Sequence, residues 1–107
     1  MSVTILGDGG AQYDFKGPFI STDSLEDRPG VYAILCDQSG RFDLIDLGES
    51  AQVRTRIENH DRKSCWNRNC TGTINYAVYY IEQGNELSRI HIEQDIRNNY
   101  YLLPCGE

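Results

Sequence analysis

The first residues that could do chemistry are an arginine and a histidine in a stretch whose pattern predicts a helix. Arg56 and His60 are four positions apart, so on a helix they project from one face with their Cβ atoms about 5 to 6 Å apart. A guanidinium can hold charge on a phosphate while an imidazole moves or positions a proton, which is what phosphoryl transfer requires. Spacing alone favours the plainer alternative, an exposed helix face with the imidazole in water.

A second candidate set recurs every four residues near the C-terminus, as Arg89, Glu93 and Arg97. The plainer interpretation is a ladder of ion pairs on a helix surface, worth about 0.2 to 0.5 kcal/mol per pair. The alternative is that Glu93, close to the apolar Ile90 and Ile96, faces inward and holds a divalent cation. One carboxylate, waters and a substrate phosphate are enough to hold Mg²⁺. By spacing alone the ladder is favoured.

Hydrophobic patterning places these residues in an α+β fold, a sheet flanked by helices. The expected elements, in chain order, are a hairpin of strands 31–36 and 42–47, a helix 51–61, a loop 62–73, a strand 74–81 and a helix 86–100. The turn-rich residues before them are expected to form a short strand or hairpin and then a loop. We therefore predict one domain over 1–107, with an N-terminal extension over 1–28.

The two predicted helices carry specific expectations about burial. Ser50 is expected to be the N-cap of the first helix, and Val53 and Ile57 its buried stripe. Arg54, Arg56, Glu58 and His60 lie off that stripe. The second helix is expected to contact the core through Leu87, Ile90, Ile96 and Tyr100.

Length and composition are typical of one globular unit, with 107 residues, 39% hydrophobic and 24% charged. No apolar run approaches the roughly 20 residues that a membrane span requires. The start of the chain has neither a basic n-region nor a long apolar h-region. We expect a cytoplasmic protein without a membrane partner.

The charge is unevenly distributed along the chain. The formal net charge is −6, yet residues 54–68 hold five basic residues against two acidic ones, a net +3 that leaves −9 for the remainder. Such a basic segment is compatible with steering an anion to one face of an acidic body. An exposed helix with several arginines is the plainer alternative. The five basic residues are Arg54, Arg56, Arg62, Lys63 and Arg68.

The four cysteines are expected to be free thiols, because a cytosolic chain is reduced and their spacing is not that of a disulfide framework. They are Cys36, Cys65, Cys70 and Cys105. Cys65 and Cys70, with His60 nearby, could form half of a zinc site. A structural zinc site normally needs a second matched pair, and the chain offers none.

Together these residues resemble the GIY-YIG nuclease superfamily, which includes homing endonucleases and the N-terminal nuclease domain of the excision-repair endonuclease. The resemblance covers about residues 29 to 104. It implies a three-stranded, mostly antiparallel sheet flanked by helices. The residues that carry it are Gly30-Val31-Tyr32, the hairpin, Asp46-Leu47-Gly48, Arg56 eight residues past that glycine, His60 four further, and Glu93.

The activity that the resemblance implies is metal-dependent hydrolysis of phosphodiester bonds in DNA. Glu93 would bind Mg²⁺ or Mn²⁺, Arg56 would stabilise charge on the phosphate, and a water activated by Tyr32 or His60 would attack in line. The basic segment would hold the DNA, through Arg54, Arg62, Lys63 and Arg68 beside Arg56. Five phosphate contacts predict a log–log salt slope of about −4 to −5.

Two positions depart from the family pattern. Asp46 replaces the tyrosine of the second half-motif, and Cys105 and Gly106 follow Pro104 where an asparagine is usual. Asp46 could serve as a base or a second metal ligand, or it could repel the substrate phosphate. Two alternatives to the nuclease are a module that binds protein or nucleic acid without cleaving it, and a hydrolase of nucleotides or other small molecules.

Overall fold

A long antiparallel hairpin organises the fold. In the computed structural model, which describes residues 1–100 and 102–106, β3 (Gly30–Gln38) pairs with β4 (Arg41–Ser50). The β3–β4 turn is tight because Ser39 and Gly40 both adopt positive φ, the backbone that a two-residue hairpin needs. On its other side β3 pairs with the antiparallel β5 (Thr73–Tyr80).

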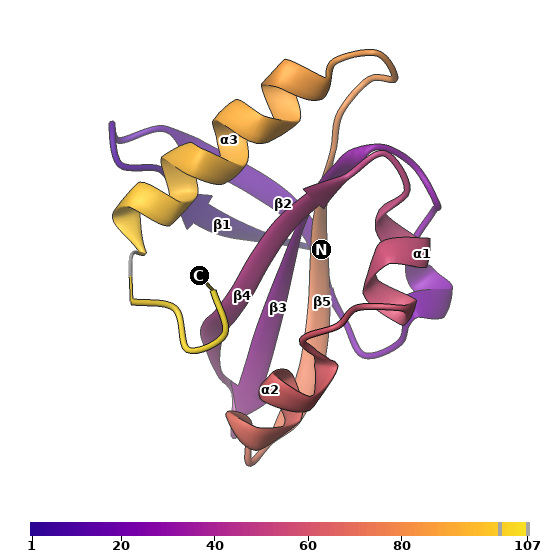
Figure 1. The fold of residues 1–107 in the computed structure, drawn as a ribbon. Coiled ribbons are helices and arrows are strands. Elements are labelled where there is room, and N and C mark those ends of the chain that lie inside the picture. Colours follow the sequence, from indigo (N-terminus) through magenta and orange to yellow (C-terminus); the bar gives the residue numbers. More distant parts are fainter. Residues whose placement is uncertain (101, 107) are drawn as a thin grey trace.

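The N-terminal residues complete the same sheet. Strands β1 (Ser2–Leu6) and β2 (Gln12–Phe19) form a hairpin, and β2 pairs with β5, so the strand order is β1-β2-β5-β3-β4. The predicted α+β class is confirmed, but a three-stranded sheet is wrong because there are five strands. The first hairpin joins the sheet because Ile5 and Phe15 are buried against it. The resulting sheet is curled (Figure 1).

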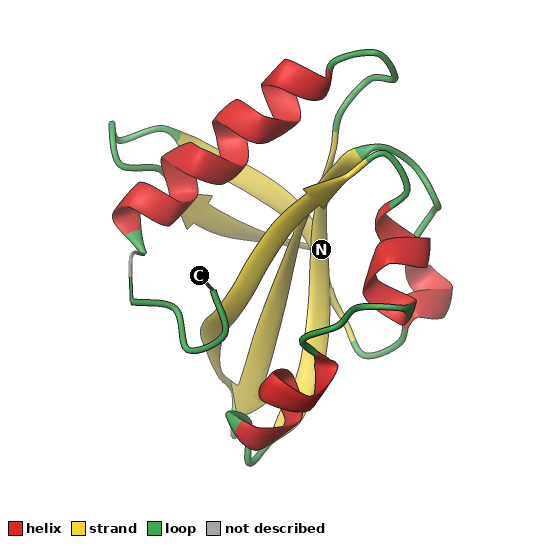
Figure 2. Cartoon of the chain, viewed as in Figure 1, coloured by secondary structure: helices red, strands yellow, loops and turns green. Residues whose placement is uncertain are grey.

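Helices cover both faces of this sheet (Figures 1 and 2). Helix α3 (Glu86–Asn99) packs on one face, over a core that includes Phe15, Leu47 and Ile96. The short helices α1 (Val53–Glu58) and α2 (Lys63–Arg68) pack on the other, over a second core that includes Tyr32 and Trp66. The 3₁₀ turn η1 (Thr22–Ser24) contacts α1.

The first predicted helix is shorter than expected, and the segment that follows it is not a simple loop. Ser50 belongs to β4, and its Oγ accepts the N–H of Gln52, so it closes a turn instead of capping the helix. Val53 and Ile57 are fully buried, which confirms the predicted stripe. Within the segment expected to be a loop lies α2, whose Trp66 is buried in the core.

Helix α3 contacts the core through only part of the predicted set. Ile96 is buried and Tyr100 packs against the same core, as expected, but Leu87 and Ile90 are 82% and 42% exposed. The buried residue in the first turn is Arg89, because the acidic Glu49 of β4 faces the helix there and pairs with it. Within the described ranges, no helix has both the length and the apolar character required to cross a membrane.

The cysteines form two disulfides, Cys36–Cys70 and Cys65–Cys105. The expectation of free thiols is therefore wrong, and both members of the suggested zinc pair are in these disulfides. The partners lie 34 and 40 residues apart in sequence, so no local spacing could have shown the pairing. Their Cα atoms come within 5.5 and 5.9 Å, which is the distance that a disulfide needs.

Candidate active site

A buried hydrogen bond joins two of the predicted site residues. Tyr32 lies on β3, and His60 follows the end of α1, and the Oη of Tyr32 is 2.8 Å from Nε2 of His60. Both residues are buried, with 1% and 5% of their surface exposed. The alternative of an imidazole in water is therefore wrong, because the chain turns inward after α1 and packs the ring against Tyr32 and Trp66.

The other ring nitrogen of His60 fixes the direction of this hydrogen bond. The backbone N–H of Arg62 donates to Nδ1 of His60 at 3.0 Å, so Nδ1 is an acceptor. In a neutral imidazole the proton is then on Nε2, and Nε2 donates to the Tyr32 oxygen. The phenolic O–H of Tyr32 is left to donate to another acceptor. Both nitrogens of His60 are thus engaged, and the histidine orients the phenol.

Burial shifts the pKa of both groups toward their neutral forms. It lowers the pKa of His60, and the nearby charges of Arg56 and Arg62 lower it further. Burial also raises the pKa of Tyr32 to about 12, although the charge of Arg56 opposes this shift. Near neutral pH the pair is therefore an uncharged imidazole and a protonated phenol, which makes Tyr32 a hydrogen-bond donor.

The two motif glycines are required by close packing around this pair. A Cβ on Gly48 would lie 2.2 Å from Oη of Tyr32, so only glycine lets β4 pass the phenol. A Cβ on Gly30 would lie 2.7 Å from the backbone oxygen of Tyr79 on β5. Gly48 therefore makes room for the Tyr32 ring, and Gly30 allows the close approach of β3 to β5.

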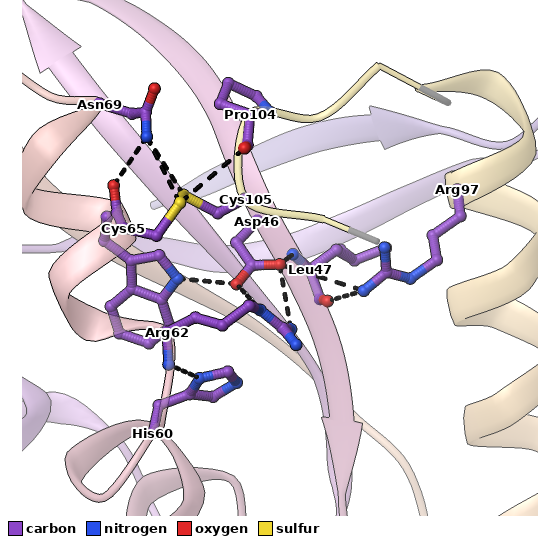
Figure 3. Close-up of a disulfide and its surroundings, with 10 residues drawn as sticks. Asp46, Leu47, His60, Arg62, Cys65, Asn69, Arg97, Pro104 and Cys105 are labelled. Carbon is purple, nitrogen blue, oxygen red and sulfur yellow. Dashed lines mark hydrogen bonds and ion pairs between the residues drawn. A yellow bond between two sulfur atoms is a disulfide. The ribbon is translucent and has the colours of Figure 1, made fainter.

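Asp46 sits at the centre of a buried polar cluster (Figure 3). Its carboxylate accepts hydrogen bonds from Trp66 Nε1 at 2.7 Å, Arg62 Nε at 2.8 Å, Arg62 Nη2 at 3.2 Å and its neighbour Leu47 N at 2.8 Å. These four bonds use the four lone-pair positions of a carboxylate. A second cation, Arg97, lies 4.0 Å away. This geometry assigns Asp46 to holding α2 on β4, and leaves it no free lone pair for a metal or a proton.

A β-bulge turns Asp46 toward α2. The register of β3 with β4 shifts between the pairs Ile34↔Asp46 and Leu35↔Leu44, so Ile45 is an extra residue. A bulge breaks the strict alternation of sides along a strand. Ile45 and Asp46 consequently both contact the core under α1 and α2, whereas Leu44 and Leu47 pack on the α3 side.

Glu93 lies in a second polar set, at the edge of the sheet where α3 crosses β4. Its Oε2 accepts from Arg97 Nε at 3.3 Å, and its side chain is 22% exposed. Burial raises the pKa of Glu93, which the Arg97 charge only partly offsets. Arg97 also donates to the carbonyl oxygen of Leu47. The predicted Glu93–Arg97 pair of the ladder is thus present, but it is partly buried and tied to the sheet.

The other half of that ladder does not form. Arg89 turns away from Glu93 and donates Nε to Glu49 Oε1 at 2.9 Å. Asp46 links the two polar sets, because Arg62 and Arg97 lie 2.8 and 4.0 Å from its carboxylate and Arg97 also contacts Glu93. Partly buried ion pairs thus connect the cluster around Asp46 to Glu93.

Most of the predicted DNA-binding cations are already paired. Arg54 contacts Asp23 and Glu58, Arg56 contacts Asp61 at 3.2 Å, and Arg62 is committed to Asp46. Lys63 donates to the backbone oxygen of Glu58. Among the described residues, neither Lys63 nor Arg68 has an ion-pair partner within 4.0 Å.

Sequence reasoning missed the burial of Trp66, the structural use of Arg62 and the contact of Arg97 with Leu47. Trp66 and Arg62 are four apart, the spacing of one helix face, and a lone tryptophan in a polar segment was a signal of burial. Nothing local linked them to Asp46, which lies 16 and 20 residues earlier.

Comparisons of the chain with models of protein families, with curated proteins and with solved structures found no match.

Proposed function

We propose that the chain is a metal-dependent endonuclease of the GIY-YIG kind, hydrolysing phosphodiester bonds in DNA. The observation that carries the proposal is the Tyr32–His60 hydrogen bond, formed between residues 28 apart and oriented so that Nε2 of His60 donates to the phenol oxygen.

Three groups of the proposed site would act on the phosphate or on the attacking water: Tyr32, Arg56 and a cation held by Glu93. Tyr32, oriented by His60, donates its O–H to an oxygen of the substrate or of the attacking water. Arg56 stabilises negative charge that develops on the phosphate. Its present partner Asp61 is 74% exposed, and such surface pairs are worth little, so Arg56 is free to exchange it for the substrate.

Glu93 fits the role of a single-carboxylate ligand for Mg²⁺ or Mn²⁺. Its contact to Arg97 uses Oε2. Burial raises the pKa of Glu93, and a bound cation would favour the charged carboxylate. Waters and substrate oxygens would supply the other ligands. When bound, such a cation acts as a Lewis acid on the phosphate.

The direct test is cleavage of supercoiled plasmid and branched DNA in Mg²⁺ or Mn²⁺. We expect Tyr32→Phe, Glu93→Gln and Arg56→Gln each to lower the rate about a hundredfold or more, as removal of one electrostatic group does elsewhere. Matched controls are Tyr79→Phe on β5, the exposed Glu86→Gln on α3 and the 75%-exposed Arg41→Gln. Cleavage that survives both Tyr32→Phe and Glu93→Gln would refute the proposed site.

One observation favours a second candidate function, a module that binds nucleic acid without cleaving it. Asp46, at the position of the motif tyrosine, has all its lone pairs occupied. The site therefore lacks one of the two phenols of the family. Wild-type protein that binds DNA in a salt-sensitive way but cleaves no substrate with either metal would establish this second function.

A further inference from the structure

A cavity of about 430 Å³ opens at the end of the sheet opposite the β3–β4 turn. Three segments that are far apart in sequence frame it: the residues before β3, the start of α1, and the loop between β5 and α3 (Figure 1). Its polar lining includes Arg28, Gln52, Gln83 and Arg89. Tyr32 and His60 are not part of this lining.

The frame of this cavity is held by hydrogen bonds between the three segments. The carbonyl of Arg28 accepts from Val53 N at 3.1 Å, at the start of α1. The carbonyl of Pro29 accepts from Ile81 N at 2.9 Å, at the end of β5. The cavity is therefore formed by the folded backbone without any ligand, as ligand sites usually are.

Arg89 lines the cavity and is nine-tenths buried. Its side chain is 9% exposed, and Nε donates to Glu49 Oε1 at 2.9 Å. Among the described residues no hydrogen bond uses its two Nη groups. Within the same part of the chain, no buried side-chain nitrogen or oxygen lacks a partner. The Nη groups of Arg89 are therefore accessible and available to a ligand.

A second arginine, Arg28, also lines the cavity. Its guanidinium stacks over the ring of Tyr80, 4.6 Å from the centroid, and its ion pair to Glu26 is long at 3.6 Å and exposed. The neighbouring carboxylate of Asp27 is held toward α1, because its two oxygens accept from Thr55 N and Thr55 Oγ1 at 2.9 and 2.7 Å. The charged lining thus consists of two arginines and one carboxylate.

We propose that this cavity binds the phosphate group of a ligand, held between Arg89 and Arg28. The lining residues that carry hydrogen-bond donors are Arg89 in the first turn of α3, Arg28 in the loop before β3, and Gln52 and Gln83. Converging donors of this kind suit a tetrahedral anion, whereas one bidentate arginine satisfies a planar carboxylate. The site goes beyond the proposed nuclease, since it requires neither a divalent cation nor cleavage.

The experiment is a titration of the folded, disulfide-bonded protein without divalent cations, followed by amide chemical shifts in NMR. The probes are inorganic phosphate, a nucleoside 5′-monophosphate, an oligonucleotide without terminal phosphates, and acetate as the planar control. We expect phosphate to shift the amides of residues 27–30, 51–53 and 83–89. Tighter binding of the monophosphate would identify a small phosphate ester as the ligand, and tighter binding of the oligonucleotide a nucleic-acid backbone.

Variants separate this site from general electrostatic attraction. Arg28→Gln and the double variant Arg89→Gln/Glu49→Gln, which removes both members of the ion pair, should each weaken phosphate binding about tenfold or more. Arg41→Gln, at the far end of the sheet, also removes one positive charge but should change the affinity for phosphate little. Acetate binding as tightly as phosphate, equal weakening by Arg41→Gln, or shifts spread over the surface would overturn the proposal. None of these readouts depends on DNA cleavage.

Discussion

At the scale of single residues, the role of Asp46 is set by the groups that its carboxylate contacts. A carboxylate at a motif position could bind a metal or take a proton, but here it receives four hydrogen bonds from Trp66, Arg62 and the backbone. A buried charge is tolerated only when it is paired in this way. The position therefore stabilises the fold around the site.

Removing this carboxylate should be strongly destabilising. Asp46→Ala leaves Arg62 and the indole N–H of Trp66 without their partner, and we expect the free energy of unfolding to fall by about 3 kcal/mol. Urea denaturation measures it. The matched control Asp43→Ala, on the same strand but 41% exposed, should cost at most about 0.5 kcal/mol. Similar losses for both would show that the cluster contributes nothing special.

His60 should make the protein less stable as the pH falls below about 6.5. Its folded pKa is lowered below the unfolded value of 6.5, so the unfolded chain binds the proton more readily. The stabilising effect is complete above pH 6.5 and is lost as the pH falls toward the folded pKa. The free energy of unfolding of the wild type, measured by urea denaturation, should be lower at pH 5.5 than at pH 7.5. His60→Gln should reduce this difference.

The exposed His91→Gln is the control for this dependence and should leave it unchanged. Glu93 acts with the opposite sign, because its raised pKa contributes stability at low pH that is lost as the pH rises through the folded pKa. The lowered pKa values of Asp27, Glu58, Asp61 and Asp95 affect stability only at more acidic pH. A difference in unfolding free energy between pH 7.5 and pH 5.5 that is identical in the wild type and His60→Gln would contradict the prediction.

At the scale of elements, α2 is the part whose position depends most on covalent links. It has six residues and no side-chain cap, and an isolated helix of this length is not stable. Cys65 within it is bonded to Cys105 in the C-terminal segment, and Cys70 just after it is bonded to Cys36 on β3. The disulfides therefore hold Trp66 and Arg62 near Asp46.

Loss of either disulfide should destabilise the protein by about 2 to 4 kcal/mol, the range for loops of this size. The variants are Cys65→Ser/Cys105→Ser and Cys36→Ser/Cys70→Ser, measured by urea denaturation. Hydrogen exchange should accelerate most at the amides of α2. Exchange that accelerates equally in α2 and in α3 would mean that the links stabilise the whole domain and not this helix.

At the scale of the whole molecule, the charge balance limits how DNA could be bound. The net charge is −6, and three of the five basic residues of segment 54–68 are in ion pairs. The pair of Arg62 with Asp46 is buried, whereas the partners Asp23 and Asp61 are 85% and 74% exposed. Binding through this face therefore uses fewer cations than the count in the sequence suggested.

The salt dependence of DNA binding should reflect this smaller number. Lys63 and Arg68 alone give a log–log slope of about −2, and about −4 is reached only if Arg54 and Arg56 exchange their exposed partners for phosphates. Fluorescence anisotropy at several salt concentrations measures the slope. Lys63→Gln/Arg68→Gln should flatten it by about 2, and Lys16→Gln/Arg41→Gln should not. A slope unchanged by the first variant would place the DNA elsewhere.

The two disulfides also bear on where the protein works. Disulfides persist mainly in oxidising compartments, whereas the prediction of a cytoplasmic protein rested on the absence of a leader-like start. We propose that the active form is the oxidised one, in whichever compartment maintains it. Alkylation of the protein in its native cells, followed by mass spectrometry, would show whether the four cysteines are bonded there.

The sequence by itself determined the α+β class, the order of β3, β4, α1, β5 and α3, and the buried stripe of α1, although it did not indicate α2. These features depend on periodicity and turn residues within a few positions, such as Val53 and Ile57 one helical turn apart. The i and i+4 spacing of Arg56 and His60 did not decide their placement, because α1 ends at Glu58 and His60 lies beyond it, buried against Tyr32.

Only the tertiary structure decided the partners across longer distances. Arg62 reaches Asp46 from 16 residues away, Cys105 reaches Cys65 from 40, and the N-terminal hairpin joins the sheet beside β5. A bulge at Ile45 then turned Asp46 toward Trp66. Such contacts arise when separate apolar faces pack together, and a local pattern contains no information about which polar groups that packing brings within reach.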